Sequence, residues 1–223
     1  TERRRNNAMN KKRAVIFFDG ACLPYNPGGI ATYGFVIRDE DENIVLQEKG
    51  IASEKGTNNI AEYTGLIRAL EKALELGYTH VRIYGDSQLV VNQINEIYQV
   101  RSENIIPLYE KAIKLLRKFK SWKISWIRRE DNKDADRLST LAFIEYVESK
   151  NRKKAREIKP EEIRKIDENR FVVRGYSITL NPLSCECPYF KKFNSFPLLR
   201  RDRILIKCKH ILAVEQFIRS FRD

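Results

Sequence analysis

Thr79–Val91 reads THVRIYGDSQLVV, an apolar segment rich in strand-forming residues that runs directly into Asp86. The same arrangement occurs earlier, where Ala14–Gly20 reads AVIFFDG and Asp19 follows the apolar residues. Short apolar runs of this kind are typical of buried strands. A carboxylate beside a buried strand is costly to desolvate unless it has a partner. The two acids therefore indicate a polar site built on a sheet.

The segments around these two strands predict an α/β fold, a mixed five-stranded sheet with flanking helices. Strands are expected at residues 14–18, 30–37, 44–51, 81–84 and 122–127. The longest helix is expected to begin at Thr57 or Asn58 and to end at Gly77, because its apolar residues recur at helical spacing. Further helices are expected at 88–97, 105–119 and 132–147. Three strands followed by alternating helices and strands favour helices packed on one mixed sheet.

A composition change near residue 149 predicts two domains. Residues 149–162 read SKNRKKAREIKPEE, which is charged and lacks apolar periodicity. We expect an N-terminal extension at 1–12, the sheet domain at 13–148, a charged linker at 149–162 and a small domain at 163–223. The alternative is that the charged segment extends the preceding helix.

The net charge of +12 is concentrated in the last third of the chain. Residues 149–223 hold 19 Lys and Arg against 9 Asp and Glu, whereas residues 1–148 hold 23 against 21. This asymmetry is typical of a nucleic-acid-binding surface, although a solubilising basic surface remains open. No apolar run is long enough to span a membrane, and no signal peptide opens the sequence. Few cysteines, clustered near one histidine, indicate a metal site in a reducing compartment, so we expect a cytoplasmic location.

Four acids are expected to form one metal site. Asp19 and Asp86 follow strands, Glu62 lies near the start of the long helix, and Asp136 lies near the start of the closing helix. Acids at helix starts also complement the helix dipole, but this does not explain acids beside buried strands. Adjacent carboxylates repel one another, and Mg²⁺ prefers such oxygen ligands. The acids are therefore expected to bind Mg²⁺, or Mn²⁺, and a two-ion site suits phosphoryl displacement.

Five motifs along residues 13–147 together resemble type 1 ribonuclease H. They are FDGAC, NPGG, TNNIAEY, YGDSQLV and REDNKDADRLS, in that order. The resemblance implies hydrolysis of the RNA strand of RNA–DNA hybrids, leaving 5′-phosphate and 3′-hydroxyl ends. It also implies that Asp19, Glu62, Asp86 and Asp136 are the catalytic metal ligands.

Amide side chains beside the acids suit substrate contact. Asn26, Asn59 and Gln88 are expected to bind substrate, although asparagines in turns and caps also bond their own backbone. The family's best-known bacterial pattern has a histidine in the loop before the last aspartate, and this loop has none. Arg129 is expected to hold a phosphate there, or else to be a solvated charge. Some members of the family also carry a basic helical handle, and the corresponding segment here is short and nearly neutral.

The C-terminal segment predicts a second metal site. Cys185, Cys187, Cys208 and His210 form a Cys₃His set suited to one structural Zn²⁺, although ordinary buried cysteines remain the alternative. The CxC…CKHILAV pattern resembles a SWIM-type zinc finger, which implies nucleic-acid or protein binding. Basic and aromatic residues lie between the ligand pairs. The basic residues suit phosphates, and the aromatic residues are expected either to stack on bases or to form a small core. Together these residues are Tyr189, Phe190, Lys191, Lys192, Phe193, Phe196, Arg200, Arg201 and Arg203.

The leading interpretation is therefore a metal-dependent ribonuclease that acts on RNA–DNA hybrids, with a zinc finger that aids nucleic-acid binding. Cleavage of double-stranded RNA is an alternative, because both duplexes have A-like shapes. A non-catalytic nucleic-acid-binding adaptor is another, and loss of one of the four acids would be its mark. The zinc finger could instead dock a protein partner.

Overall fold

A computed structural model describes residues 12–195 and 205–221. The chain divides into two compact units, Thr1–Phe143 and Ile144–Asp223. None of the described helices is long and apolar enough to cross a membrane.

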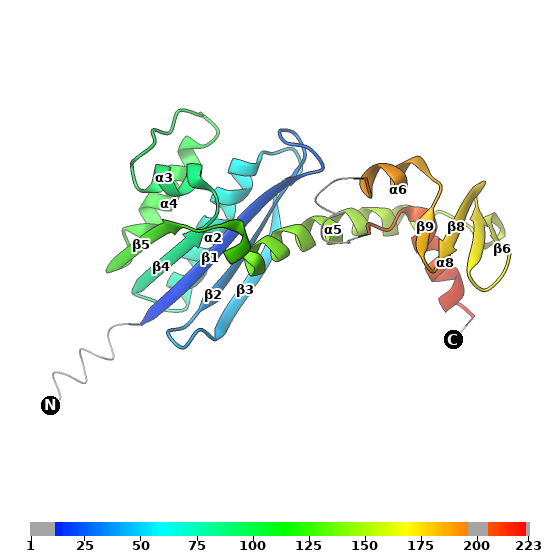
Figure 1. Ribbon diagram of the computed structural model, residues 1–223, viewed down its shortest axis with the longest axis horizontal. Coiled ribbons are helices and arrows are strands. Elements are labelled where there is room, and N and C mark those ends of the chain that lie inside the picture. The colour runs from blue at the N-terminus through cyan, green and yellow to red at the C-terminus, as the bar shows by residue number, and fades with distance from the viewer. Residues whose placement is uncertain (1–11, 196–204, 222–223) are drawn as a thin grey trace. The chain divides into compact units, whose positions relative to one another are not determined.

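The first unit is built on a mixed five-stranded sheet, as the sequence predicts. Its strand order is β3-β2-β1-β4-β5, so β1 is the central strand (Figure 1). The first three strands, β1 (Arg13–Leu23), β2 (Ile30–Arg38) and β3 (Ile44–Ser53), are antiparallel neighbours. The strands β4 (His80–Gly85) and β5 (Ser121–Trp126) extend the sheet in parallel with β1.

Helices α2 (Asn58–Glu75), α3 (Gln88–Ile94) and α4 (Ile106–Leu116) enclose the main core of this unit. The hydroxyl of Thr57 accepts a hydrogen bond from the Ile60 amide and so caps the start of α2, as expected. Gly77 follows the helix with a φ of +77°, a conformation that favours glycine. After a short 3₁₀ turn, η1 (Arg129–Asp131), helix α5 (Lys133–Ala155) begins.

The first strand is longer than the sequence predicts. We expected it to end at Phe18, with Asp19 after its end, but β1 continues to Leu23 and Asp19 is paired with Gly34 inside the ladder. The five added residues, Asp19–Leu23, pair with the first five residues of β2. The sequence pattern missed this because Gly20 and Ala21 break the apolar run, whereas pairing with β2 keeps the segment extended.

The second unit is a four-stranded antiparallel sheet with helices around a small core. Its strands lie in sequence order, β6 (Ile163–Lys165), β7 (Arg170–Val173), β8 (Tyr176–Leu180) and β9 (Leu183–Cys185). A 3₁₀ turn, η2 (Pro160–Glu162), precedes them, and α6 (Pro188–Phe193) and α8 (Lys209–Arg219) follow. Their apolar residues gather with the three C-terminal cysteines in one buried cluster.

The predicted linker differs from the structure. Residues up to Ala155 continue α5, which is the alternative that the sequence left open. Ala155 and Ile158 are buried in the core of the second unit. The compact second unit therefore begins at Ile144, not at residue 163. The sequence misled because two apolar residues spaced among many charges show no clear periodicity.

Candidate functional site

Three of the four predicted acids meet at the sheet of the first unit. Carboxylate oxygens of Asp19, Glu62 and Asp86 lie within 4.8 Å of one another. Asp19 comes from the middle of β1, Glu62 from the second turn of α2, and Asp86 from the residue after β4. Because β1 and β4 are parallel neighbours, Asp86 follows the strand end that lies beside Phe18, next to Asp19.

Gly20 allows α2 to approach β1 closely enough to form this cluster. A Cβ atom added at Gly20 would lie 2.2 Å from the backbone nitrogen of Glu62 and 2.4 Å from the carbonyl carbon of Ala61. Such a contact with backbone atoms cannot be relieved by a side-chain rotation. The glycine in FDGAC therefore has a steric reason, which is to place the Glu62 backbone directly against the strand that carries Asp19.

Burial makes the cluster electrostatically unfavourable as a set of free carboxylates. Asp19 is 4% exposed, and burial, followed by the negative charge of Asp86, raises its pKa from 3.8 to about 7. The pKa of Glu62 is raised well above its ordinary value, first by burial and then by the charges of Asp19 and Asp86. Such repulsion is relieved when a cation lies between the carboxylates.

The hydrogen bonding of Glu62 fits a cation site. Its Oε2 atom is buried and has no hydrogen-bond partner among the described residues. An unpaired buried carboxylate oxygen is costly, since it loses water and gains nothing in exchange. Three converging carboxylates with one oxygen left unpaired are a suitable donor set for Mg²⁺ or Mn²⁺, which bind hard oxygen ligands.

Asp136, the fourth predicted acid, forms an ion pair instead of joining the three-carboxylate cluster. Its Oδ1 atom accepts a hydrogen bond from Nη2 of Arg129. The predicted phosphate-binding residue and the predicted fourth ligand therefore neutralise each other in this conformation. The negative charge of Asp136 still contributes to the raised pKa of Asp19, so Asp136 lies within electrostatic range of that carboxyl group.

Two positioning residues were missed by the sequence reasoning. The buried Asn132 donates from Nδ2 to the Phe18 carbonyl at 2.9 Å and to Oδ1 of Asp86 at 3.0 Å. The buried Ser139 donates from Oγ to Oδ2 of Asp19. Both residues lie inside the motif REDNKDADRLS, but nothing local shows that they reach strands more than forty residues away.

The predicted substrate-contact amides lie at or against the starts of two helices, α2 and α3. Asn26 is exposed, and its Oδ1 accepts a hydrogen bond from the Asn58 amide at 3.1 Å. The Asn58 side chain accepts from the Cys22 amide at 2.7 Å, so it links β1 to the start of α2. Asn59 is half-buried in the first turn of α2, and Gln88 is exposed as the first residue of α3. Asn59 and Gln88 therefore lie at the starts of two helices, each within three residues of a clustered acid in the sequence.

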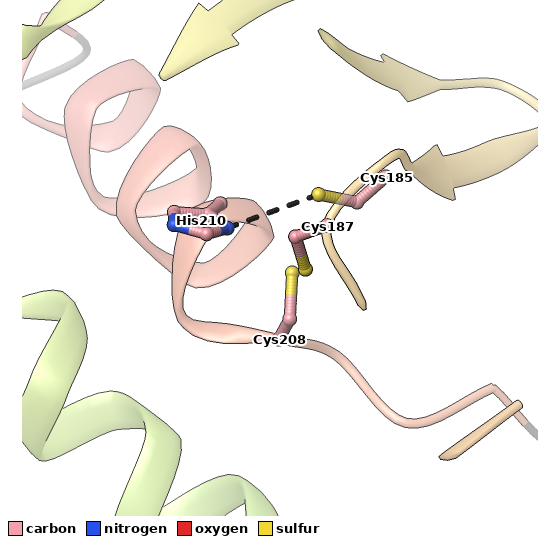
Figure 2. Close-up of side chains that lie close together, drawn as sticks. All are labelled: Cys185, Cys187, Cys208 and His210. Atoms are coloured by element: carbon pink, nitrogen blue, oxygen red, sulfur yellow. Dashed lines mark hydrogen bonds between the residues drawn. The ribbon is translucent and has the colours of Figure 1, made fainter. Parts of the chain in front are cut away.

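The four predicted zinc ligands meet in the second unit. One ligand atom from each of Cys185, Cys187, Cys208 and His210 lies within 4.8 Å of the others, and all four residues are buried (Figure 2). Figure 2 shows the two residues of the CxC pair facing the start of α8, where Cys208 is the N-cap residue and His210 lies in the first turn. Sγ of Cys185 lies 3.9 Å from Nδ1 of His210. This Cys₃His donor set is the type that holds structural zinc.

Hydrogen bonds between the gathered thiols shift the cysteine pKa values in opposite directions. The Cys208 pKa falls to about 4, chiefly because the Cys185 thiol donates a hydrogen bond to its sulfur. The Cys185 pKa is raised by the same hydrogen bond and then by burial. Sharing of protons between neighbouring thiols indicates sulfurs crowded around one point, which a divalent cation would occupy as thiolates lose their protons.

The described aromatic residues of this segment pack in or against the small core of the second unit. Phe190 is buried in the core cluster, and Tyr189 packs against it while stacking on Phe193 with ring centroids 4.4 Å apart. This supports the expectation that they form a small core. Lys191 and Lys192 are exposed on α6. Four further residues singled out there lie outside the described part of the chain, namely Phe196, Arg200, Arg201 and Arg203.

The first unit has the ribonuclease H fold, as solved structures of that class show. The N-terminal RNase H domain of Rv2228c from Mycobacterium tuberculosis, solved as a fusion with maltose-binding protein, matches with a TM-score of 0.59 and 34% identity. The match covers 62% of this chain and 99% of that one. LC11-RNase H1, solved in complex with an RNA/DNA hybrid, matches with a TM-score of 0.54 and 31% identity over 58% of this chain and 95% of that one.

Residues 17–142, more than half of the chain, match the family model described as "Reverse transcriptase-like", and the chain belongs to this family. Two curated relatives match the chain over 131 residues each. The bifunctional protein Rv2228c of M. tuberculosis is 40% identical over 131 residues, which are 59% of this chain and 35% of the relative. Ribonuclease HI of Halobacterium salinarum is 37% identical over 131 residues, 59% of this chain and 64% of the relative. The match thus spans about a third of the length of Rv2228c.

Proposed function

We propose that the first unit hydrolyses the RNA strand of RNA–DNA hybrids and leaves 5′-phosphate and 3′-hydroxyl ends. The observation that carries this proposal is the buried cluster of Asp19, Glu62 and Asp86, with one oxygen of Glu62 left without a partner. Relatives support the choice of substrate, since one is named ribonuclease HI and another was solved with an RNA/DNA hybrid.

In this proposal the cluster holds two Mg²⁺ ions, or Mn²⁺, with Asp136 as the fourth ligand. Bound ions of this kind supply a nucleophile from water and neutralise charge on the leaving oxygen. The chain's own contribution is positioning. Asn132 holds Asp86, Ser139 holds Asp19, and the backbone at Gly20 holds Glu62 in place. Rigid supports of this kind reduce the freedom that the reacting groups would otherwise have to lose.

The side chains around the cluster would bind the substrate. Asn26, Asn59 and Gln88 offer amides that can bond sugars and base edges without adding charge. Arg129 is suited to a phosphate, which would compete with its ion pair to Asp136. A guanidinium does not act as a proton acceptor at neutral pH, so Arg129 would replace only the charge of the missing loop histidine.

For the second unit we propose a SWIM-type zinc finger that aids nucleic-acid binding. The four converging ligands support one structural Zn²⁺, and the segment from residue 149 onward carries most of the net positive charge. Zinc would add stability that a core of this size lacks by itself. The finger would then provide part of the substrate grip that the absent basic handle provides in relatives.

The test is cleavage of a short hybrid labelled on its RNA strand. Wild type, Asp86→Asn and the matched control Asp41→Asn are compared with and without Mg²⁺, alongside RNA–RNA and DNA–DNA duplexes. Asp41 is exposed in the turn between β2 and β3, far in sequence from the cluster. We expect Mg²⁺-dependent cutting of the hybrid's RNA strand by wild type and Asp41→Asn, with a loss of at least about a hundredfold in Asp86→Asn.

Other outcomes would point to the other functions. Cutting of the RNA–RNA duplex at a similar rate would extend the substrate class to double-stranded RNA. Binding without any cutting, unchanged by Asp86→Asn, would contradict the nuclease proposal and favour a nucleic-acid adaptor. Deletion of residues 155–223 that leaves hybrid affinity and its salt dependence unchanged would refute the role given to the finger, and protein docking would become the better explanation.

A further inference from the structure

A pocket in the second unit lies beside the Cys₃His cluster. Its volume is about 340 Å³, at the lower end of the range typical of small-ligand sites. Its walls come from the last turns of α5, the turn between β7 and β8, the start of α6 and the start of α8. All of these segments belong to the second unit. No function considered so far uses this pocket.

Two of the three positively charged side chains that line the pocket have no acidic partner within the described part of the chain. These two are Lys154 and Lys209. Arg174 also lines the pocket but is held by Glu162, with Nε 2.6 Å from Oε1 and Nη2 3.0 Å from Oε2. None of the described lining residues is an acid. A Zn²⁺ with three thiolates would carry one net negative charge. The two positive charges of Lys154 and Lys209 exceed it, so the pocket would remain positively charged.

Aromatic faces form the apolar part of the pocket. Tyr176 is half-buried and packs at an angle on the His210 ring, with centroids 4.9 Å apart. Tyr189 is also half-buried, and its hydroxyl accepts a hydrogen bond from Nδ2 of the buried Asn151 at 3.2 Å. Asn151 is itself anchored to the Lys207 carbonyl at 2.9 Å. The tyrosine walls are therefore held in place before any ligand arrives.

We propose that this pocket binds one nucleotide of a single-stranded nucleic acid, with the base against the tyrosines and the phosphate at Lys154 and Lys209. Positive charge combined with fixed aromatic faces is what single-strand binding requires. A duplex keeps its bases stacked inside and would offer the pocket only phosphates. The inference deepens the nucleic-acid-binding role proposed for the second unit and rests on it.

The test measures binding of the zinc-loaded full chain in an Asp86→Asn background, so that hybrids stay intact. The probes are a blunt RNA–DNA hybrid and the same hybrid with a single-stranded extension of DNA or of RNA. We expect the extension to strengthen binding about tenfold. The double variant Lys154→Gln, Lys209→Gln should lose most of this gain, and the slope of log affinity against log salt should fall by about 1.4. A 2-aminopurine base in the extension should be quenched on binding only when both lysines are present.

The matched control is Lys153→Gln, Lys165→Gln, which removes two exposed lysines of the same unit that do not line the pocket. This control should keep the gain. Equal gains for RNA and DNA extensions would support recognition of phosphate and base alone, and a gain for one would identify the sugar preferred. The proposal fails if the extension adds nothing, if a double-stranded extension gives the same gain, or if both double variants behave alike.

Cleavage of the blunt hybrid by the chain with Asp86 intact is measured separately. Absence of cleavage together with normal binding of the extension would contradict the nuclease proposal and leave the pocket proposal standing. Normal cleavage with no effect of the extension would contradict the pocket alone.

Discussion

Replacing Asp19 with asparagine is expected to stabilise the magnesium-free protein while abolishing its activity. Asp19 is 4% exposed, and its pKa is raised from 3.8 to about 7 by burial and by neighbouring acids. The folded state therefore binds the proton of this carboxyl more tightly than the unfolded state does. As the pH rises from about 4 to about 7, ionisation of Asp19 removes stability from the fold, and the loss persists at higher pH.

The magnitude follows from the two pKa values. A tenfold change in proton affinity corresponds to about 1.4 kcal/mol, so the rise from 3.8 to about 7 corresponds to about 4 kcal/mol above neutral pH. Asn cannot ionise, and its carboxamide oxygen can still accept the hydrogen bond from Ser139. Because Glu62 and Asp86 still repel each other in the variant, we expect about 2–4 kcal/mol of stabilisation, or about 6–12 °C in melting temperature.

The assay is thermal unfolding followed by circular dichroism, with Zn²⁺ present throughout and with or without excess Mg²⁺. At about pH 8 without Mg²⁺, Asp19→Asn should melt above wild type, and the difference should vanish at about pH 4, where both side chains are neutral. Excess Mg²⁺ should raise the melting temperature of wild type much more than that of the variant, because binding to the folded state alone stabilises it.

The control is Asp41→Asn, an identical chemical change at an exposed position, which should alter stability by no more than about 0.5 kcal/mol at either pH. If Asp19→Asn melts below wild type at about pH 8 without Mg²⁺, or if its advantage does not depend on pH, the reasoning from burial and repulsion is wrong.

Three further outcomes are expected. Gly20→Ala should cost about 3 kcal/mol in chemical denaturation and abolish cleavage, since its Cβ would lie 2.2 Å from the Glu62 nitrogen; a variant of wild-type stability would contradict the close approach of α2. Asn132→Ala should lower kcat at least tenfold with little change in KM, because Asp86 loses a hydrogen bond and the Phe18 carbonyl its donor; a change confined to KM would argue for substrate contact instead. Cys208→Ala should eliminate the one Zn²⁺ per chain measured by mass spectrometry and make the segment from Ile144 protease-sensitive; bound zinc at full occupancy would exclude this residue as a ligand.

Local patterns in the sequence predicted much of the fold. The helix capped by Thr57 and ended at Gly77 has the expected bounds within a few residues, because periodicity and capping depend on neighbouring residues. The two clusters of candidate ligands were also expected, although the sequence analysis placed Asp136 with the other three acids, since carboxylates beside strands and closely spaced cysteines are chemically unusual wherever they occur. The identity of the ligand types is a property of the sequence itself.

The relations between distant residues required the tertiary structure. Only the pairing of β1 with β2 places Asp19 inside a strand, and only the packing of α5 against the sheet brings Ser139 to Asp19 and Asn132 to Asp86. The pairing of Arg129 with Asp136 depends likewise on how the loop folds back on its own helix. Residue types and local spacing determine which chemistry the chain offers, whereas long-range packing decides which of those groups meet, because hydrogen bonds and charges act over a few ångströms and not along the chain.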